Sequence, residues 1–343
     1  MSWLHLRRIR ARIAGVIACL TLAGCGIDQG GVTSPTPGPA TSSSSGLLVV
    51  GPITGFGSVL VNGIALQTAA ADVLVDGNPV AESVLREGQI IRAVAAVTST
   101  SINAVTIEYR ASVRGPIQAR RIDGAAVILG QLVITNERTV FDIGGGNSLN
   151  DIALFANVEV SGFRLPSGEL LATWVGLAEL TDSFTMAATI TSVDAAGLTF
   201  DLDGLTVDFS EPLLLDVPAG VPDTGIVVEV RGTRLNDQGE LVASEIRALP
   251  GRPGDVVVAD TTEDAFAPAR ATDTGTRRAN VFGVVTAIGL PASISIGDVT
   301  VAIDTLTQIG NGDLGFIGIG QLVRVEGDVT NTGIIQADRI ELL

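Results

Sequence analysis

The stretch that decides the fold is Ile319-Gly320-Gln321-Leu322-Val323-Arg324-Val325-Glu326-Gly327, which a short polar turn joins to residues 333–342. Val323 and Val325 alternate with Arg324 and Glu326, which is the period-2 pattern of a strand with one buried face and one solvated face. The second run alternates in the same way and follows within a few residues. The pattern therefore predicts a β-hairpin formed by these two runs.

This hairpin recurs. Its first strand aligns with Val158-Glu159-Val160 and Val228-Glu229-Val230, and with Ile90-Ile91-Arg92 as a weaker copy. In the second strand an Ala and a β-branched residue recur three apart, as Ala104 and Ile107, Ala172 and Val175, Ala243 and Ile246, and Ala337 and Ile340. A spacing of three breaks strict alternation, so we expect a β-bulge there that returns both side chains to the inner face.

The front half of each copy also repeats. Alternating apolar residues flank a two-residue break, which is Asn62-Gly63, Gly130-Gln131, Asp203-Gly204 or Gly297-Asp298. Such pairs suit type I′ or II′ turns, which need positive φ. Their Asn and Asp residues are therefore interpreted as turn formers rather than as binding residues.

The first copy has further elements between its halves. Val73-Leu74-Val75 predicts a strand, residues 76–79 a turn, and residues 84–88 one helical turn closed by Gly88. Three strands, a helical turn and two strands is the order of an OB-fold barrel. We therefore predict an all-β chain of about four tandem small OB-like β-barrels. The alternative is one continuous twisted sheet or a solenoid that runs through the repeats.

The predicted organisation has seven parts: a lipoprotein signal peptide (1–24), a lipid-anchored flexible tether (25–46), β-repeat 1 (47–113), β-repeat 2 (114–181), β-repeat 3 (182–250), a polar linker (251–279) and β-repeat 4 (280–343).

The N-terminus has the parts of a secretory signal. Four Arg precede residue 13, an apolar run of about ten residues follows, and Leu22-Ala23-Gly24-Cys25 ends it. This ending resembles a bacterial lipobox, which implies lipidation of Cys25 and a membrane partner. Gly26 follows the Cys, and by resemblance to proteobacterial lipoproteins this implies the outer membrane, on its periplasmic or its surface side. The Pro- and Ser-rich stretch up to residue 46 predicts a disordered spacer.

A family resemblance rests on residues 51–63, Val75-Asp76-Gly77 and residues 85–89. These stretches resemble a bacterial domain of unknown function, family 5666, which occurs in tandem copies in exported proteins and lipoproteins. The resemblance implies an OB-like fold and an envelope location, and it brings no catalytic residues. The first copy carries it most fully and the fourth keeps the hairpin half. The second and third copies depart in the opening Gly-rich strand.

The composition excludes several chemistries. The only His is His5, the chain has no Lys, and Cys25 is the one Cys beyond the signal. These facts remove Ser-His-Asp and Cys-His catalysis, His or Cys metal sites and Lys Schiff bases, and we expect no cofactor. The part after the signal has 17 Arg against 37 acids, so it repels nucleic acid.

Calcium is the remaining metal hypothesis. Asp201, Asp203 and Asp208 lie close in sequence, and Asp142, Asn147 and Asp151 form a second group. Turn carboxylates can hold Ca²⁺, but neither group has the spacing of an EF-hand loop. Polar turns and solvated strand faces are the favoured interpretation, and no metal site is predicted.

These observations lead to one functional hypothesis. We expect a non-enzymatic bacterial envelope lipoprotein whose OB-like repeats form a scaffold or binding module for protein or glycan partners. Two alternatives stay open. One is a carboxylate-dependent carbohydrate-active enzyme, which needs two carboxylates across a cleft, and the other is a purely structural surface spacer.

Overall fold

A computed structural model describes residues 45–179, 183–249, 277–289, 292–296, 299–310, 317–330 and 332–343. The predicted signal, residues 25–44 of the predicted tether with Cys25, and residues 251–276 of the predicted linker lie outside this part of the chain, whereas tether residues 45 and 46 belong to the first strand. The described part is all-β, as predicted, with 59% of residues in strands and no α-helix. It contains no helix long and apolar enough to cross a membrane.

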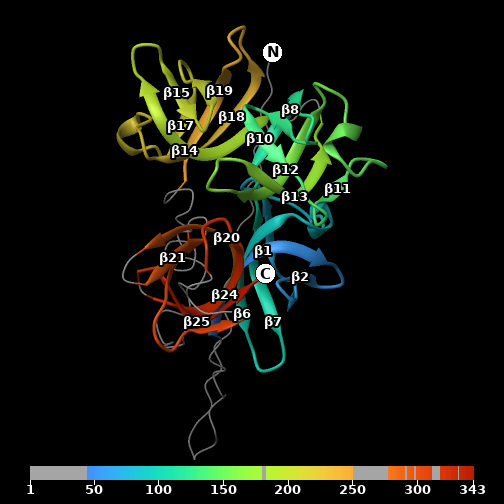
Figure 1. Ribbon diagram of the computed structural model, residues 1–343, viewed down its shortest axis with the longest axis vertical. Coiled ribbons are helices and arrows are strands. Elements are labelled where there is room, and N and C mark those ends of the chain that lie inside the picture. The colour runs from blue at the N-terminus through green and yellow to red at the C-terminus, as the bar shows by residue number, and fades with distance from the viewer. Residues whose placement is uncertain are drawn as a thin grey trace, which may run out of the picture. The chain divides into compact units, whose positions relative to one another are not determined.

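The strands follow in four similar sets, coloured from blue to red along the chain (Figure 1). Repeat 1 has β1 (Ser45–Gly55), β2 (Val59–Val61), β3 (Ile64–Leu66), β4 (Asp72–Val75), β5 (Asn78–Pro79), the 3₁₀ turn η1 (Glu82–Val84), β6 (Ile90–Val97) and β7 (Ile102–Tyr109). Repeat 2 has β8 (Val113–Arg120), β9 (Ala126–Ile128), β10 (Gln131–Ile134), β11 (Val140–Asp142), η2 (Leu149–Asp151), β12 (Asn157–Arg164) and β13 (Leu170–Leu177).

Repeat 3 has β14 (Phe184–Asp194), β15 (Thr199–Leu202), β16 (Leu205–Asp208), β17 (Leu213–Leu215), η3 (Pro218–Gly220), β18 (Val227–Leu235) and β19 (Leu241–Ala248). Repeat 4 has β20 (Arg278–Gly289), β21 (Ser293–Ile296), β22 (Val299–Ala302), β23 (Gln308–Gly310), β24 (Leu322–Val329) and β25 (Ile335–Leu342). The helical turn expected at residues 84–88 forms slightly earlier, as η1, and Leu85 is already extended.

The predicted hairpins and their bulges are confirmed in all four repeats. The register shifts by one residue in each, opposite Ala95, Gly162, Gly232 and Gly327. The extra residue lies between the Ala and the β-branched residue of the second strand, so both side chains are buried. In repeat 4 Ala337 is 3% exposed and Ile340 is fully buried. The bulge thus returns the side chains to the inner face.

The prediction of tandem small OB-like barrels is wrong. Hydrogen-bonded sheets run through the repeats, and the strands form a β-solenoid of about seven turns. Repeats 1 and 4 share a 13-stranded sheet, and repeats 2 and 3 share a 12-stranded sheet. In the first sheet β1 pairs with β20 in parallel, and in the second β8 pairs with β14 antiparallel.

The cause of the sharing between repeats 1 and 4 lies in the first strand of repeat 1. β1 pairs with β6 along residues 45–52, but β2 covers its other edge only from Ile53 onward. Residues 47–50 therefore have a free row of backbone donors and acceptors, and residues 278–281 of β20 occupy it. An exposed strand edge pairs readily with another strand, and a ~60-residue repeat buries too little apolar surface to be very stable alone.

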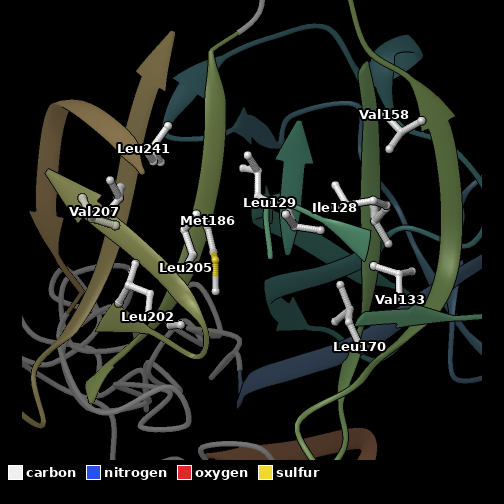
Figure 2. Packing of buried hydrophobic residues seen from close by; sticks show 14 of the residues in the cluster. Ile128, Leu129, Val133, Val158, Leu170, Met186, Leu202, Leu205, Val207 and Leu241 are labelled. Carbon is white, nitrogen blue, oxygen red and sulfur yellow. The ribbon is translucent and has the colours of Figure 1, made fainter. Parts of the chain in front are cut away.

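The hydrophobic cores are shared between the same pairs of repeats as the sheets. One cluster joins repeats 2 and 3, as Figure 2 shows for Ile128, Leu129 and Met186, among others. The core of repeat 4 includes Leu48 and Val94 from repeat 1. Repeat 1 keeps a third cluster of its own around Ile53, Ile91 and Ile107. Each shared core removes apolar surface from water that an isolated repeat would expose.

The tight turns match the sequence in two of the three described cases. Asn62-Gly63 and Asp203-Gly204 have positive φ, as type I′ turns require. In repeat 2 the break is Leu129-Gly130 instead of Gly130-Gln131. Leu129 adopts this unfavourable backbone because its side chain is fully buried against Gly115, where a Cβ would lie 2.5 Å from Leu129 Cγ. The predicted Gly297-Asp298 turn lies outside the described residues.

Candidate functional site

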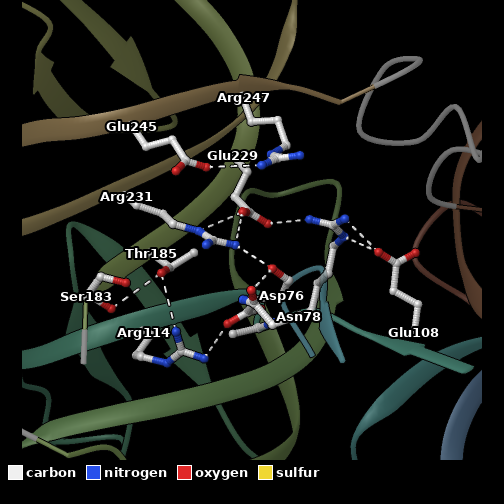
Figure 3. A network of polar contacts seen from close by, with 12 residues as sticks. Asp76, Asn78, Glu108, Arg114, Ser183, Thr185, Glu229, Arg231, Glu245 and Arg247 are labelled. Carbon is white, nitrogen blue, oxygen red and sulfur yellow. Dashed lines mark hydrogen bonds and ion pairs between the residues drawn. The ribbon is translucent and has the colours of Figure 1, made fainter. Parts of the chain in front are cut away.

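Repeats 1, 2 and 3 meet at a network of charged side chains (Figure 3). Its upper part surrounds Glu229 of β18, which is 1% exposed. Arg231 contacts Glu229 at 2.6 Å, and Arg110 reaches the same carboxylate at 2.9 Å from just beyond β7. Arg110 also contacts Glu108 at 2.6 Å. The buried carboxylate of Glu229 is therefore neutralised by two guanidinium groups that come from different repeats.

The lower part of the network surrounds Arg114 of β8. Its guanidinium contacts Asp76 of repeat 1 at 2.7 Å and Glu159 of β12 at 2.5 Å. Tyr109 donates its hydroxyl proton to Glu159 at 2.8 Å. Arg231 closes the connection by donating to the backbone oxygen of Asp76 at 2.8 Å. The turn at Asp76 thus links the two parts of the network.

Burial and charge set the proton affinities here. Burial disfavours the charged form of Arg114, but attraction to Glu159 and Asp76 outweighs it, so its pKa lies above the ordinary value. Burial raises the pKa of Tyr109 well above 10, and the Glu159 carboxylate raises it further. Tyr109 therefore stays protonated and donating, and the network is a set of paired charges that joins repeats.

Two cavities lie between repeats, and Arg110 of the network lines the larger of them. The smaller, about 290 Å³, is lined by residues of repeats 1, 2 and 4, and the larger, about 480 Å³, by residues of all four repeats. Phe163 and Phe282 line both cavities, with ring centroids 5.6 Å apart. Pockets of this size are typical of small-molecule sites. Both cavities exist only where repeats meet, so no single repeat contains either.

The charges on the cavity walls are mostly positive. Arg138, Arg324 and Glu87 line the smaller cavity, and Arg110 and Arg164 line the larger. Glu87 is the one acid among the described residues on either wall. A glycosidase needs two carboxylates that face each other across the substrate, and neither described wall offers such a pair.

The predicted site residues lie apart from these cavities. Cys25 is outside the described residues. Asp201 accepts hydrogen bonds from Thr191 Oγ1 (2.8 Å) and from the backbone N–H of Gly204 (3.0 Å). Asp203 lies in a tight turn, 3.5 Å from Arg164, and Asp208 accepts the backbone N–H of Ser210.

No calcium ligand set forms from these residues. No group of three or more His, Cys, Asp or Glu that could hold a metal occurs in the described part of the chain. In the second acidic group Asp142 pairs with Arg86, while Asp151 accepts from Ser148 and from the backbone of Asn147. In both groups the carboxylates make turn hydrogen bonds and ion pairs with Arg.

Sequence reasoning missed the charge network. The alternation in Val228-Glu229-Val230 places Glu229 on the outer face of its hairpin, where solvent was the natural expectation. Nothing local indicates that another repeat covers that face. A usable signal was the cluster Glu108-Tyr109-Arg110, which carries three polar groups at a repeat boundary.

Comparison with known proteins gives one result. No curated protein matches the chain. A sequence model of the family described as Domain of unknown function (DUF5666) matches residues 114–176, 182–247 and 282–341. The expected tandem copies of this family are thus confirmed in three matches, although the first copy, expected to resemble it most, is not among them. Since these matches cover more than half of the chain, the protein belongs to the DUF5666 family.

Proposed function

We propose that this protein is a non-enzymatic bacterial envelope lipoprotein, lipidated at Cys25, whose repeats act together as one binding module. The lipobox and the Pro- and Ser-rich tether support the anchor, and Gly26 after the Cys supports the outer membrane. The predicted partners are an envelope protein or a glycan. The tandem DUF5666 repeats supply the folded part, which stands off the membrane on the tether that precedes β1.

One observation carries the binding role. Both cavities lie where repeats meet, so joining the repeats creates concave sites that a string of independent repeats lacks. The non-enzymatic role is supported by the state of the buried acids. Asp76, Glu159 and Glu229 are each paired with Arg, which leaves them poor candidates for acid–base work.

Membrane fractionation of cells that express the full chain tests the anchor. Cys25→Ser removes the acceptor for the lipid, so the variant should leave the membrane fraction. Cys19→Ser is the matched control, because it removes the other Cys of the chain and leaves the lipobox intact. Retention of Cys25→Ser in membranes at the wild-type level would contradict the proposal.

The binding role needs its own test. Wild-type protein solubilised from membranes should retain a specific envelope protein or glycan in a pull-down, and Cys25→Ser should retain the same partner because its folded part is unchanged. Absence of any specific partner, together with absence of ligand binding to either cavity, would contradict the binding role and leave only a structural spacer.

A further inference from the structure

The walls of the two cavities carry more positive than negative side chains, whereas the chain as a whole has a net negative charge. The whole sequence has 21 Arg and 37 acids, whereas the cavity walls present four Arg and Glu87 alone among the described residues. Of these, the two Arg of the larger cavity are already paired: Arg110 with Glu108 and Glu229, and Arg164 with Asp203. The excess positive charge that remains for a ligand is therefore concentrated at the smaller cavity.

Arg138 is the most available of these cations. It is exposed in the turn between β10 and β11, and its side chain has no hydrogen bond or ion pair within the described residues. Arg324 on β24 uses Nη1 for Glu341 at 3.2 Å, while its Nε is buried and has no hydrogen-bond partner among the described residues. Two guanidinium groups with unused donor capacity thus border the same cavity, from repeats 2 and 4.

Much of the remaining wall of the smaller cavity is apolar, and Thr54, Asn62, Asn136 and Thr173 add neutral polar groups to it. Ile53, Leu171 and the Phe163–Phe282 pair contribute its walls, and the same Phe pair continues into the larger cavity. A molecule with an apolar chain and an anionic head would match both the walls and the guanidinium groups.

We propose that the smaller cavity binds a single-chain anionic amphiphile, with its head at Arg138 and Arg324 and its chain along Phe163 and Phe282. This inference rests on the proposed binding role and names the ligand class. The net negative charge of the protein repels every anion at long range. Head-group binding therefore depends on short-range contact with these two side chains.

The test is isothermal titration calorimetry on the full chain with Cys25→Ser, using sodium dodecanoate below the concentration at which it forms micelles. We expect one dodecanoate per chain. Butyrate should bind far more weakly than dodecanoate because it lacks the long apolar chain. Dodecyltrimethylammonium should also bind far more weakly, because its head group is positively charged. Dodecyl phosphate compares a phosphate head with a carboxylate head on the same chain. Binding of either anion supports the amphiphile, and the tighter one identifies the head.

Four variants then locate the site. Arg138→Gln and Arg324→Gln should each weaken dodecanoate binding about tenfold or more, because each removes charge-assisted hydrogen bonds. Glu87→Gln should strengthen it by removing a repelling charge. Arg121→Gln is the control, since Arg121 is exposed, pairs with Asp123 and lines neither cavity. Thermal melts confirm that each variant folds.

Three results would overturn the inference. These are absence of binding by both dodecanoate and dodecyl phosphate, equal binding of the cationic amphiphile, and unchanged affinity for the anionic amphiphile in both Arg138→Gln and Arg324→Gln. If any of these results is found while membrane fractionation still shows the anchor and the pull-down still retains a partner, the amphiphile is excluded as the ligand. The proposed anchored binding module would then still stand.

Discussion

The hairpins β18–β19 and β24–β25 are built alike but are used differently. In each hairpin, two outward-pointing residues of the first strand lie opposite two outward-pointing residues of the second strand. These pairs are Glu229–Arg247 and Arg231–Glu245 in repeat 3, and Arg324–Glu341 and Glu326–Arg339 in repeat 4. In repeat 3, Arg110 and Asp76 of repeat 1 cover this face. In repeat 4 the four side chains instead line a shallow hollow of about 240 Å³.

The difference shows that the two faces of the hairpin have separate roles. The inner face, with its Val residues and its bulge, is the same in both repeats and determines the fold. The outer face determines what the repeat contacts. Glu229 is 1% exposed, whereas the side chains of Arg324 and Glu341 are 30% and 29% exposed. The carboxylate of the ion pair is thus buried in repeat 3 and partly exposed in repeat 4, so the cost of removing its charge partner should differ between the two repeats.

The largest expected effect is that of Glu229→Gln. Removing this buried carboxylate leaves the half-buried guanidinium groups of Arg110 and Arg231 without their shared partner, and breaking a buried ion pair typically costs about 3–5 kcal/mol. Arg324→Gln is the matched control, because Arg324 occupies the same register position in repeat 4 and should cost at most about 1 kcal/mol. Urea unfolding followed by circular dichroism measures both. Equal losses of unfolding free energy in the two variants would contradict the difference between the two hairpins.

The bulge should behave alike in both hairpins. A Cβ on Gly232 would lie 2.3 Å from the oxygen of Val242, and one on Gly327 would lie 2.1 Å from the oxygen of Gln336. Gly232→Ala and Gly327→Ala should therefore each destabilise by about 1–3 kcal/mol through overpacking. Gly55→Ala, whose Cβ meets nothing within 4 Å, is the control. A clear loss in only one repeat would show that the inner faces are not equivalent.

Tyr109→Phe extends the comparison to repeat 2, where Glu159 occupies the position of Glu229. The variant loses one hydrogen bond to a carboxylate that Arg114 still neutralises, and we expect a loss of about 1.5 kcal/mol at neutral pH.

The pH dependence gives this variant a second readout. The pKa of Tyr109 is higher in the folded state than its unfolded value near 10, so its contribution is complete below about pH 10. It is lost as the pH rises through the folded-state pKa. The stability gap between wild type and Tyr109→Phe should therefore narrow above pH 10, and a gap independent of alkaline pH would contradict this assignment.

The smallest effect is expected at Arg339. Its side chain is exposed and has no hydrogen bond or ion pair within the described part of the chain. Arg339→Gln should change the free energy of unfolding by less than about 0.5 kcal/mol. The equivalent residue in repeat 3, Glu245, contacts Arg247 at 3.4 Å. Glu245→Gln should cost more than Arg339→Gln, and the reverse order would count against the assignment of covered and open faces.

The inner faces were predictable because they follow from local chemistry. Alternation placed Val323 and Val325 inside, and the spacing between Ala337 and Ile340 predicted the bulge; both are confirmed. The Leu129-Gly130 turn was missed because tertiary packing of Leu129 overrides turn preference.

The shared sheets were not predictable in the same way. Pairing between β1 and β20 joins segments more than 200 residues apart, and period-2 alternation does not encode a strand's partner. The order of strands within one repeat favoured a closed barrel, and the free edge at residues 47–50 became visible only in the structure. The charge network and the cavities depend on this pairing, so the candidate site could not be derived before the fold.

A double-mutant cycle between Arg110 and Glu229, which are 119 residues apart, tests the central claim most directly. If repeat 1 covers the hairpin of repeat 3, the coupling free energy from urea unfolding should be about 1–3 kcal/mol. The parallel cycle between Arg324 and Glu341 should give about 0.5 kcal/mol or less. A coupling between Arg110 and Glu229 no larger than that of the open pair would contradict the claim that a buried junction joins the repeats.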